Sequence, residues 1–115
     1  METQFGKRIR QRRIELEIGL NEMAERIKIS GAYLSRLETG KETNPSEDII
    51  VNISHELKIN PNELLALARK IPSDIAEFIH GTPRVPEFLR EARKRSLSDE
   101  DWQKLIEDIK KSNPE

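Results

Sequence analysis

The stretch LNEMAERIKISGAYLSRLE, residues 20–38, constrains the fold more than any other part of the chain. Its apolar residues recur three or four positions apart on both sides of a short break, which predicts two short helices joined by an abrupt turn. Such a pair needs apolar residues before the turn, a small residue where the helices are closest, and apolar anchors on the second helix. These needs are met in turn by Met23, Ile27, Ala24, Leu34 and Leu37. A generic hairpin seldom meets them all, so the stretch predicts a helix-turn-helix.

The same periodicity predicts five short helices in the first 70 residues, at about residues 3–17, 20–27, 30–40, 46–58 and 60–67. Ser30 and Ser46 offer hydroxyl N-caps, and Gly40 is typical of a position just past a helix end. No period-2 alternation interrupts these segments. The expected fold class is therefore all-α, a compact bundle of five helices.

Pro72 marks the first domain boundary, because a proline interrupts the hydrogen-bond ladder of a helix. We expect one domain over residues 1–70 and a helical extension over residues 71–115. Three helical segments are predicted in the extension. They start at Ser73, after Pro83 and Pro86, and after Ser96 or Ser98. In the last segment one face carries Trp102, Leu105, Ile106 and Ile109.

Residue usage argues against several classes of protein. Cysteine is absent, which excludes disulfides, thiolate metal sites and cysteine nucleophiles. His55-Glu56 begins like a zinc-protease helix, but Ile59 stands where the second histidine would be needed. We therefore expect no enzyme, no metal and no cofactor. No apolar stretch approaches the roughly 20 residues that cross a bilayer, and the N-terminus lacks the apolar core of a signal peptide, so we expect a cytoplasmic protein.

Charge is distributed unevenly along the chain. Twenty basic and 21 acidic residues give a net charge of -1, which taken alone argues against a nucleic-acid partner. Residues 1–40, however, hold eight basic and six acidic side chains, a balance of +2, and residues 72–115 hold eight and ten, a balance of -2. The chain therefore has a weakly basic front and an acidic rear.

Four sequence segments carry a family resemblance: FGKRIRQRR in the first helix, MAERIKIS before the turn, YLSRLETGK through the third helix, and NPS at the start of the fourth. With them, residues 4–67 resemble the phage repressor and Cro-like helix-turn-helix family, also called the XRE family. The resemblance implies a five-helix lambda-repressor-like domain that dimerises on a two-fold double-stranded DNA operator and regulates transcription, most simply as a repressor.

Two positions depart from the family pattern. Leu20 stands where the family has a glutamine that opens the second helix, so one hydrogen-bond partner for the DNA backbone is expected to be missing. Lys28 replaces the glycine of the turn, which predicts a left-handed conformation at some cost in free energy and places a cation at the rim.

In this geometry the third helix lies in the major groove and presents its first turn and one outer stripe to base edges. The candidate base-contacting residues are Ser30, Gly31, Ala32, Tyr33, Ser35 and Arg36. Arg36 is the best single base reader, because a guanidinium bonds both acceptors of guanine; a phosphate contact or a surface ion pair is the alternative. The candidate phosphate contacts are Arg12, Lys28, Thr39, Lys41 and Thr43.

By resemblance, Arg13 and Glu38 align with a partly buried family ion pair that joins the first helix to the end of the third. Two unrelated surface charges are the alternative interpretation.

A homodimer is expected, with Leu64 to Leu67 and the following helices as its surface. The apolar face that includes Trp102 either joins this surface or covers the core of its own domain. A competing hypothesis is an antitoxin or protein-interaction module that autoregulates its operon and binds an adjacent toxin or metalloprotease through the C-terminal helices.

Overall fold

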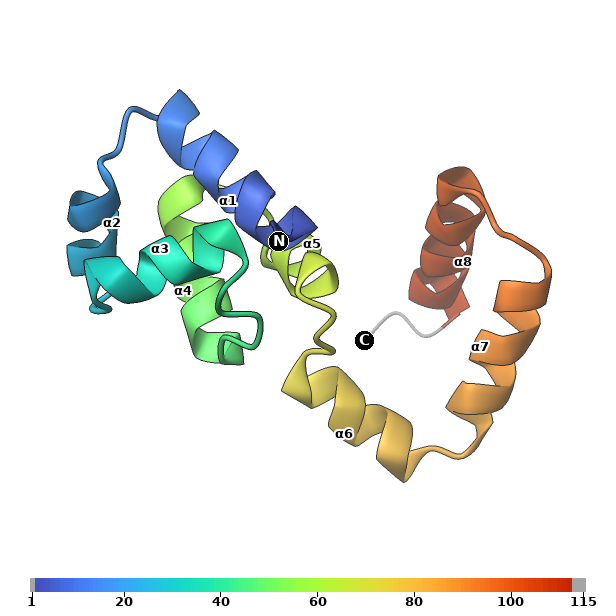
Figure 1. The fold of residues 1–115 in the computed structure, drawn as a ribbon. Coiled ribbons are helices and arrows are strands. Elements are labelled where there is room, and N and C mark those ends of the chain that lie inside the picture. Colours follow the sequence, from blue (N-terminus) through green and yellow to red (C-terminus); the bar gives the residue numbers. More distant parts are fainter. Residues whose placement is uncertain (1, 113–115) are drawn as a thin grey trace. The chain divides into compact units, whose positions relative to one another are not determined.

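The computed structural model describes residues 2–112, and every regular element in that range is a helix (Figure 1). The elements between residues 2 and 112 are α1 (Gln4–Glu15), α2 (Leu20–Arg26), α3 (Gly31–Thr39), α4 (Glu47–Leu57), α5 (Pro61–Leu67), α6 (Ser73–Gly81), α7 (Arg84–Lys94) and α8 (Asp99–Ser112). They fall into two compact units, residues 1–73 and 74–115. The all-α class is confirmed, and the five expected N-terminal helices are found within about two residues of their predicted bounds.

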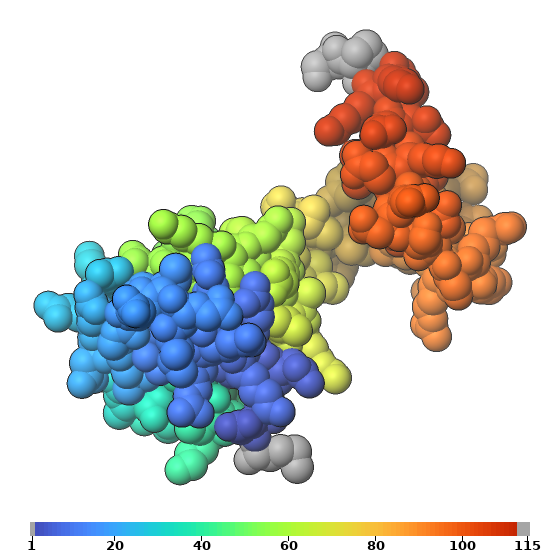
Figure 2. All heavy atoms as spheres, turned by 90° about the horizontal axis from the view of Figure 1, so that it is seen from above, coloured from blue at the N-terminus to red at the C-terminus, as the bar shows by residue number. Residues whose placement is uncertain are grey.

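The first unit places α1 to α5 around one hydrophobic core (Figure 1). Figure 2 shows the outer face of this unit, coloured from blue to yellow-green, as one closely packed group of atoms. The buried apolar set is Phe5, Ile9, Met23, Ala24, Ile27, Leu34, Leu37, Ile50, Ile53, Leu57, Ile59, Leu64 and Leu65. Burial of each large member contributes about 1.5–3 kcal/mol, so this core is the main source of the unit's stability.

Gly6 lets α1 approach α3 closely. A Cβ atom at residue 6 would lie 2.6 Å from the backbone carbonyl oxygens of both Leu37 and Glu38. Those carbonyl groups belong to a helix backbone and have little room to move. The contact between α1 and the last turn of α3 therefore requires glycine at this position.

Four helices of the first unit end without the usual glycine. The residues just past α1, α2, α4 and α5 are Glu17, Lys28, Lys58 and Arg69, and their φ angles are 57°, 60°, 55° and 57°. After α2, Ile29 N donates to Ala24 O at 2.9 Å and Lys28 N to Glu25 O at 3.2 Å, which is the Schellman pattern. The left-handed conformation predicted for Lys28 is thus confirmed, and three further helices end in the same way.

The segment after α5 is fastened to the first unit. Lys70 Nζ donates to Asn44 Oδ1 at 2.8 Å, and Ser73 N donates to the Glu47 carboxylate at 3.3 Å. These bonds tie Lys70 and Ser73, which close the first unit, to the α3–α4 loop and to the first turn of α4. The sequence placed the domain boundary after residue 70, whereas the two units divide after residue 73.

The second unit contains little buried apolar surface. Among residues 74–112, Ala92 is the one apolar residue that is buried. Large apolar side chains on all three helices of this unit remain exposed. These exposed side chains are Ile75, Phe78, Phe88, Leu89, Trp102, Ile106 and Ile109. Of the four residues on the predicted apolar face of α8, Leu105 is half-buried. Within the described residues of the second unit, no other side chains bury the apolar face of α8.

Ser98 caps α8. Asp101 N donates to Ser98 Oγ at 3.1 Å, and Ser98 N donates back to Asp101 Oδ2 at 3.0 Å. The hydrogen bond from Ser98 N to the carboxylate, and after it the Ser98 hydroxyl, lower the pKa of Asp101 below its ordinary value. Ser96, the other expected cap, instead has a left-handed backbone with φ 46°.

No helix within residues 2–112 is both long and apolar enough to span a bilayer. The same residues contain no group of three or more His, Asp or Glu side chains placed to hold a metal ion.

Candidate nucleic-acid interface

The helix-turn-helix is formed by α2 and α3, and the core fixes both helices. Met23 and Ala24 of α2 and Leu34 and Leu37 of α3 are buried. Ser30 Oγ accepts a hydrogen bond from Tyr33 N at 3.0 Å, and Gly40, with φ 83°, ends the helix. One side of α3 is therefore locked into the bundle while the other side remains available.

The six candidate base-contacting residues lie on the first turn and the outer side of α3. Ser30, Ala32 and Arg36 are exposed, and Gly31, Tyr33 and Ser35 are half-buried. Arg36 also lies over the aromatic ring of Tyr33, with its Cζ atom 5.6 Å from the ring centroid. The helix thus presents small side chains near its N-terminus and a guanidinium one turn later.

Four of the five candidate phosphate contacts are exposed at the two ends of α3. Lys28 precedes the helix, Thr39 is its last residue, and Lys41 and Thr43 lie in the loop that follows. Thr39 Oγ1 donates to Ser35 O at 2.9 Å. Neither Lys28 nor Lys41 forms an ion pair within residues 2–112. These ammonium groups are available to an anionic partner.

Arg12 differs from the other four phosphate candidates because its guanidinium is already bonded within the fold. Its Nε donates to Leu57 O at 3.0 Å, and its Nη1 donates to Glu15 Oε2 at 3.2 Å. Arg12 therefore caps the C-terminal end of α4, a role that the sequence did not predict. A phosphate contact by Arg12 remains a prediction, and it would compete with these bonds.

Arg13 and Glu38 form a two-point ion pair that joins α1 to the end of α3. Arg13 Nε and Nη2 donate to the two Glu38 carboxylate oxygens at 2.7 and 2.9 Å, and Nη1 donates to Ile18 O at 2.9 Å. The side chains are 12% and 4% exposed, respectively. The hydrogen bonds to Glu38 raise the pKa of Arg13 above its ordinary value. The pair fixes α3 against α1.

Asn21, on the first turn of α2, is a neighbour of α3 that sequence reasoning missed. An added Cβ atom at Gly31 would collide with Asn21 Oδ1. Gly31 does not have a positive φ, so its backbone conformation gives no reason for a glycine. The only signal in the sequence was a glycine at a helix start; the structure adds that its φ angle does not require glycine.

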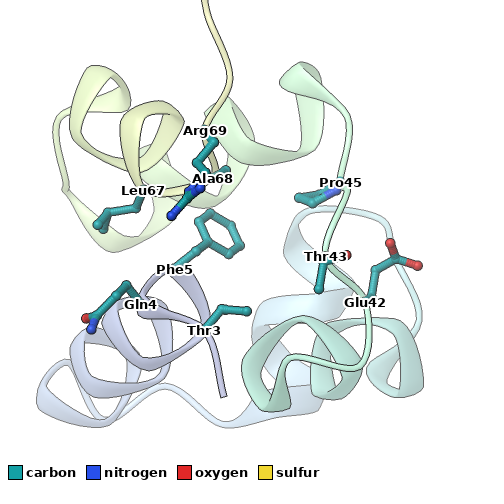
Figure 3. A pocket seen from close by; sticks show the side chains of 9 residues that line it. All are labelled: Thr3, Gln4, Phe5, Glu42, Thr43, Pro45, Leu67, Ala68 and Arg69. Carbon is teal, nitrogen blue, oxygen red and sulfur yellow. The ribbon is translucent and has the colours of Figure 1, made fainter. Parts of the chain in front are cut away.

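The loop after α3 also borders an open pocket of about 360 Å³ (Figure 3). Phe5 lies at its centre, and Glu42, Thr43 and Pro45 line the side formed by the loop. The remaining lining residues come from the start of α1 and the end of α5: Thr3, Gln4, Leu67, Ala68 and Arg69. Thr43 thus lines this pocket and is also exposed to solvent.

Comparisons with known proteins agree with this geometry. The model of the helix-turn-helix domain family matches residues 6–70. The HTH-type transcriptional regulator SinR of Bacillus subtilis (strain 168) is 36% identical over 61 residues, which are 53% of this chain and 55% of SinR. The chain thus spans about half the length of the curated SinR proteins that it matches.

Two solved structures extend the comparison. A crystal structure of SinR in complex with DNA, described as the master regulator for biofilm formation, has a TM-score of 0.51 and 35% identity; the match covers 54% of this chain and 98% of that chain. One chain of a solved complex of SinR with the SinI protein matches with a TM-score of 0.52 and 25% identity. The match covers 96% of the present chain and 100% of the matched chain of the complex.

Proposed function

Because the chain belongs to the family of helix-turn-helix domains, we propose that it is a sequence-specific regulator of transcription that binds double-stranded DNA. The observation that carries this proposal is the two-sided construction of α3. Its inner side is anchored by Leu34, Leu37 and the Arg13–Glu38 pair. Its outer side holds polar side chains between Lys28 and Lys41, which form no ion pair with any residue from 2 to 112. The solved complex of the related SinR with DNA supports it.

In the proposed complex α3 enters the major groove. Arg36 donates to the O6 and N7 acceptors of a guanine, and the methyl group of Ala32 meets a thymine methyl. Lys28 before the helix and Lys41 after it reach phosphates on the two sides of the groove, with Thr39 and Thr43 as neutral donors. The phosphate contacts set the position of the helix, and the base contacts select the sequence.

The charge distribution supports weak non-specific affinity. Residues 1–40 carry only +2, and the acidic residues 72–115 carry -2. Few phosphate contacts give a shallow dependence of affinity on salt and modest binding to random DNA. Specific binding then depends on the base contacts of α3 and on the presence of two copies. Such a regulator acts where the DNA lies, in the cytoplasm.

We further propose that the chain functions as a homodimer assembled through its C-terminal helices. The expectation that the dimer surface begins at Leu64 is wrong, because Leu64 and Leu65 are buried in the core of the first unit. The support for the homodimer is the exposed apolar surface of α6, α7 and α8, where Phe78, Phe88 and Ile109 are 60%, 49% and 67% exposed. Large apolar side chains that a soluble protein leaves exposed in number commonly mark interfaces. A two-fold dimer would place two α3 helices about one turn of DNA apart, roughly 34 Å.

A second protein is the competing occupant of this apolar surface. The complex of SinR with SinI, which this chain matches over nearly its whole length, is the specific observation that favours it. In that case the chain would serve as an interaction module, such as an antitoxin that represses its own operon, and the partner would control its DNA binding.

Selection of bound duplexes from a random pool tests the proposed function. We expect a two-fold symmetric sequence to be enriched by the wild-type chain. Arg36→Ala should change the preferred base at one position of each half-site, whereas Lys41→Ala should weaken binding to all sequences alike and reduce the salt slope. Lys104→Ala in α8 is a matched control, because it removes the same charge outside the first unit. No enrichment at moderate salt would refute the proposal.

Sedimentation of the full chain and of a chain that ends at residue 95 tests the dimer. We expect the full chain to be dimeric and the shortened chain to be monomeric. A shortened chain that remains folded and dimeric would show that α8 is dispensable for assembly. A full chain that is monomeric alone and binds DNA tightly only with a second protein would favour the competing hypothesis.

A further inference from the structure

Arg36 is held by an aromatic ring and not by a carboxylate. Its Cζ atom lies 5.6 Å from the centroid of the Tyr33 ring, one helical turn earlier. Among residues 2–112 its guanidinium takes part in no ion pair and no side-chain hydrogen bond, whereas Arg13 and Arg26 are bonded to carboxylates of Glu38 and Glu22. The stack is therefore the contact that orients the Arg36 side chain in the free protein.

Tyr33 is a fixed support for this stack. It is half-buried and packs against the hydrophobic core, and its backbone N–H donates to the Ser30 cap at 3.0 Å. A guanidinium that lies on an aromatic face keeps its N–H donors at its edges, where a planar acceptor can reach them. The ring thus limits the conformations of Arg36 without using its hydrogen-bond donors.

The nearby Glu42 carboxylate forms no ion pair with Arg36 within the described residues. Glu42 N donates to Arg36 O at 3.0 Å, so the loop after α3 folds back toward this part of the helix. The Glu42 carboxylate instead accepts a hydrogen bond from Asn44 N at 3.1 Å. Burial raises the pKa of Tyr33 above its ordinary value and Glu42 raises it further, while the positive charge of Arg36 opposes them.

We propose that Tyr33 is a positioning residue, whose ring holds the Arg36 guanidinium in the orientation that reads guanine. This inference rests on the proposed DNA-binding function and deepens it. Tyr33 then acts through Arg36 and does not itself read a base. The benefit is preorganisation, because a long arginine side chain already ordered in the free protein loses less rotamer freedom on binding.

The decisive experiment measures base discrimination in a double-mutant cycle on the full chain. The ratio of dissociation constants for the selected operator and for the same duplex with the guanine replaced is determined for the wild-type chain, Tyr33→Phe, Tyr33→Leu, Arg36→Ala and the Tyr33→Leu/Arg36→Ala pair. Tyr33→Phe keeps the ring and should keep the ratio. Tyr33→Leu should lower it about two- to five-fold, the range expected for an exposed cation–π contact, with an unchanged salt slope. In the Arg36→Ala background Tyr33→Leu should change it no further.

Three results would overturn the positioning role. The first is an unchanged ratio of dissociation constants in Tyr33→Leu. The second is a ratio lowered as much by Tyr33→Phe as by Tyr33→Leu, which would assign base reading to the Tyr33 hydroxyl. The third is a ratio that Tyr33→Leu still lowers in the Arg36→Ala background. If the wild-type chain selects no sequence, the proposed function itself fails.

A second measurement needs neither DNA nor a core substitution. Tyr33 is the only tyrosine of the chain, so its ionisation can be followed by ultraviolet absorbance without overlap from another phenol. Arg36→Ala should raise the pKa of Tyr33, because the cation that favours the phenolate is removed. An unchanged pKa would show that the stack does not exist in solution, whatever the outcome of the DNA experiments.

Discussion

Removing Arg13 should destabilise the first unit severely. Glu38 is 4% exposed, and its carboxylate oxygens are bonded to Arg13 at 2.7 and 2.9 Å. Breaking a buried ion pair by removing one partner costs about 3–5 kcal/mol, because the remaining charge stays in a medium of low polarity. A unit of 73 residues has a free energy of unfolding of about 4–11 kcal/mol in total, so Arg13→Ala would remove about a quarter of it or more.

The two partners are not equivalent. Without Glu38, the Arg13 guanidinium still donates to Ile18 O and, at 12% exposure, can reach water. Without Arg13, the Glu38 carboxylate has neither option. We therefore expect Glu38→Ala to cost less than Arg13→Ala, and the apolar replacement Arg13→Met/Glu38→Leu to cost less than Arg13→Ala, because it strands no charge.

Urea unfolding of the full chain, followed by far-ultraviolet circular dichroism at one protein concentration, measures these differences. The matched control is Arg10→Ala, an exposed arginine on the same helix that forms no ion pair within residues 2–112, and we expect it to change the free energy of unfolding by less than about 0.5 kcal/mol. In melting temperature, Arg13→Ala should lose at least about 12 °C, since each kcal/mol corresponds to roughly 4–8 °C for a unit of this size. A loss below about 1 kcal/mol for both single variants would mean that the pair behaves as a surface ion pair, and the reasoning from burial would be refuted.

Three further predictions concern other contacts of the first unit. Gly6→Ala should lower the free energy of unfolding by about 1–3 kcal/mol, because its methyl group overlaps rigid carbonyl groups of α3. Gly31→Ala should leave thermal stability unchanged or slightly higher in the same thermal melts, because the exposed Asn21 amide can rotate away and alanine favours the helix; a loss as large as that of Gly6→Ala would contradict this difference. The hydrogen bond from Arg8 lowers the pKa of Glu63, so the pair stabilises the folded chain above the ordinary carboxylate pKa and ceases to do so as the pH falls through the lowered value. Glu63→Gln should therefore unfold with a weaker dependence on pH in that acidic window, and identical pH profiles for the two chains would contradict the assignment.

The helices of the first unit were predictable because their signals are local. Ser30 and Ser46 cap α3 and α4 through hydroxyls that accept from Tyr33 N and Ile49 N, and Gly40 ends α3 in the left-handed conformation. Each of these signals lies within one turn of the helix end that it determines. Apolar spacing then decided which face of each helix enters the core.

Contacts between distant positions were not predictable from one sequence. The bond from Arg12 Nε to Leu57 O joins residues 45 positions apart, and Lys70 reaches Asn44 across 26. Nothing near Arg12 distinguishes a side chain that caps another helix from one that waits for a phosphate. The same limit applies to the candidate interface, where the pattern predicted α3 and its outer face but not the stack that orients Arg36.

The four left-handed helix ends of the first unit are positions where substitution could stabilise the fold. A residue with a Cβ atom in this conformation destabilises the fold by about 1–2 kcal/mol. Glycine removes this strain but adds an entropic cost of about 0.5–1 kcal/mol. Glycine at Glu17, Lys58 and Arg69 would thus strengthen the bundle without touching any residue assigned to DNA. At Lys28 the same exchange would also delete a cation beside α3. Stability and affinity can therefore be tuned separately at three helix ends, and are coupled at the fourth.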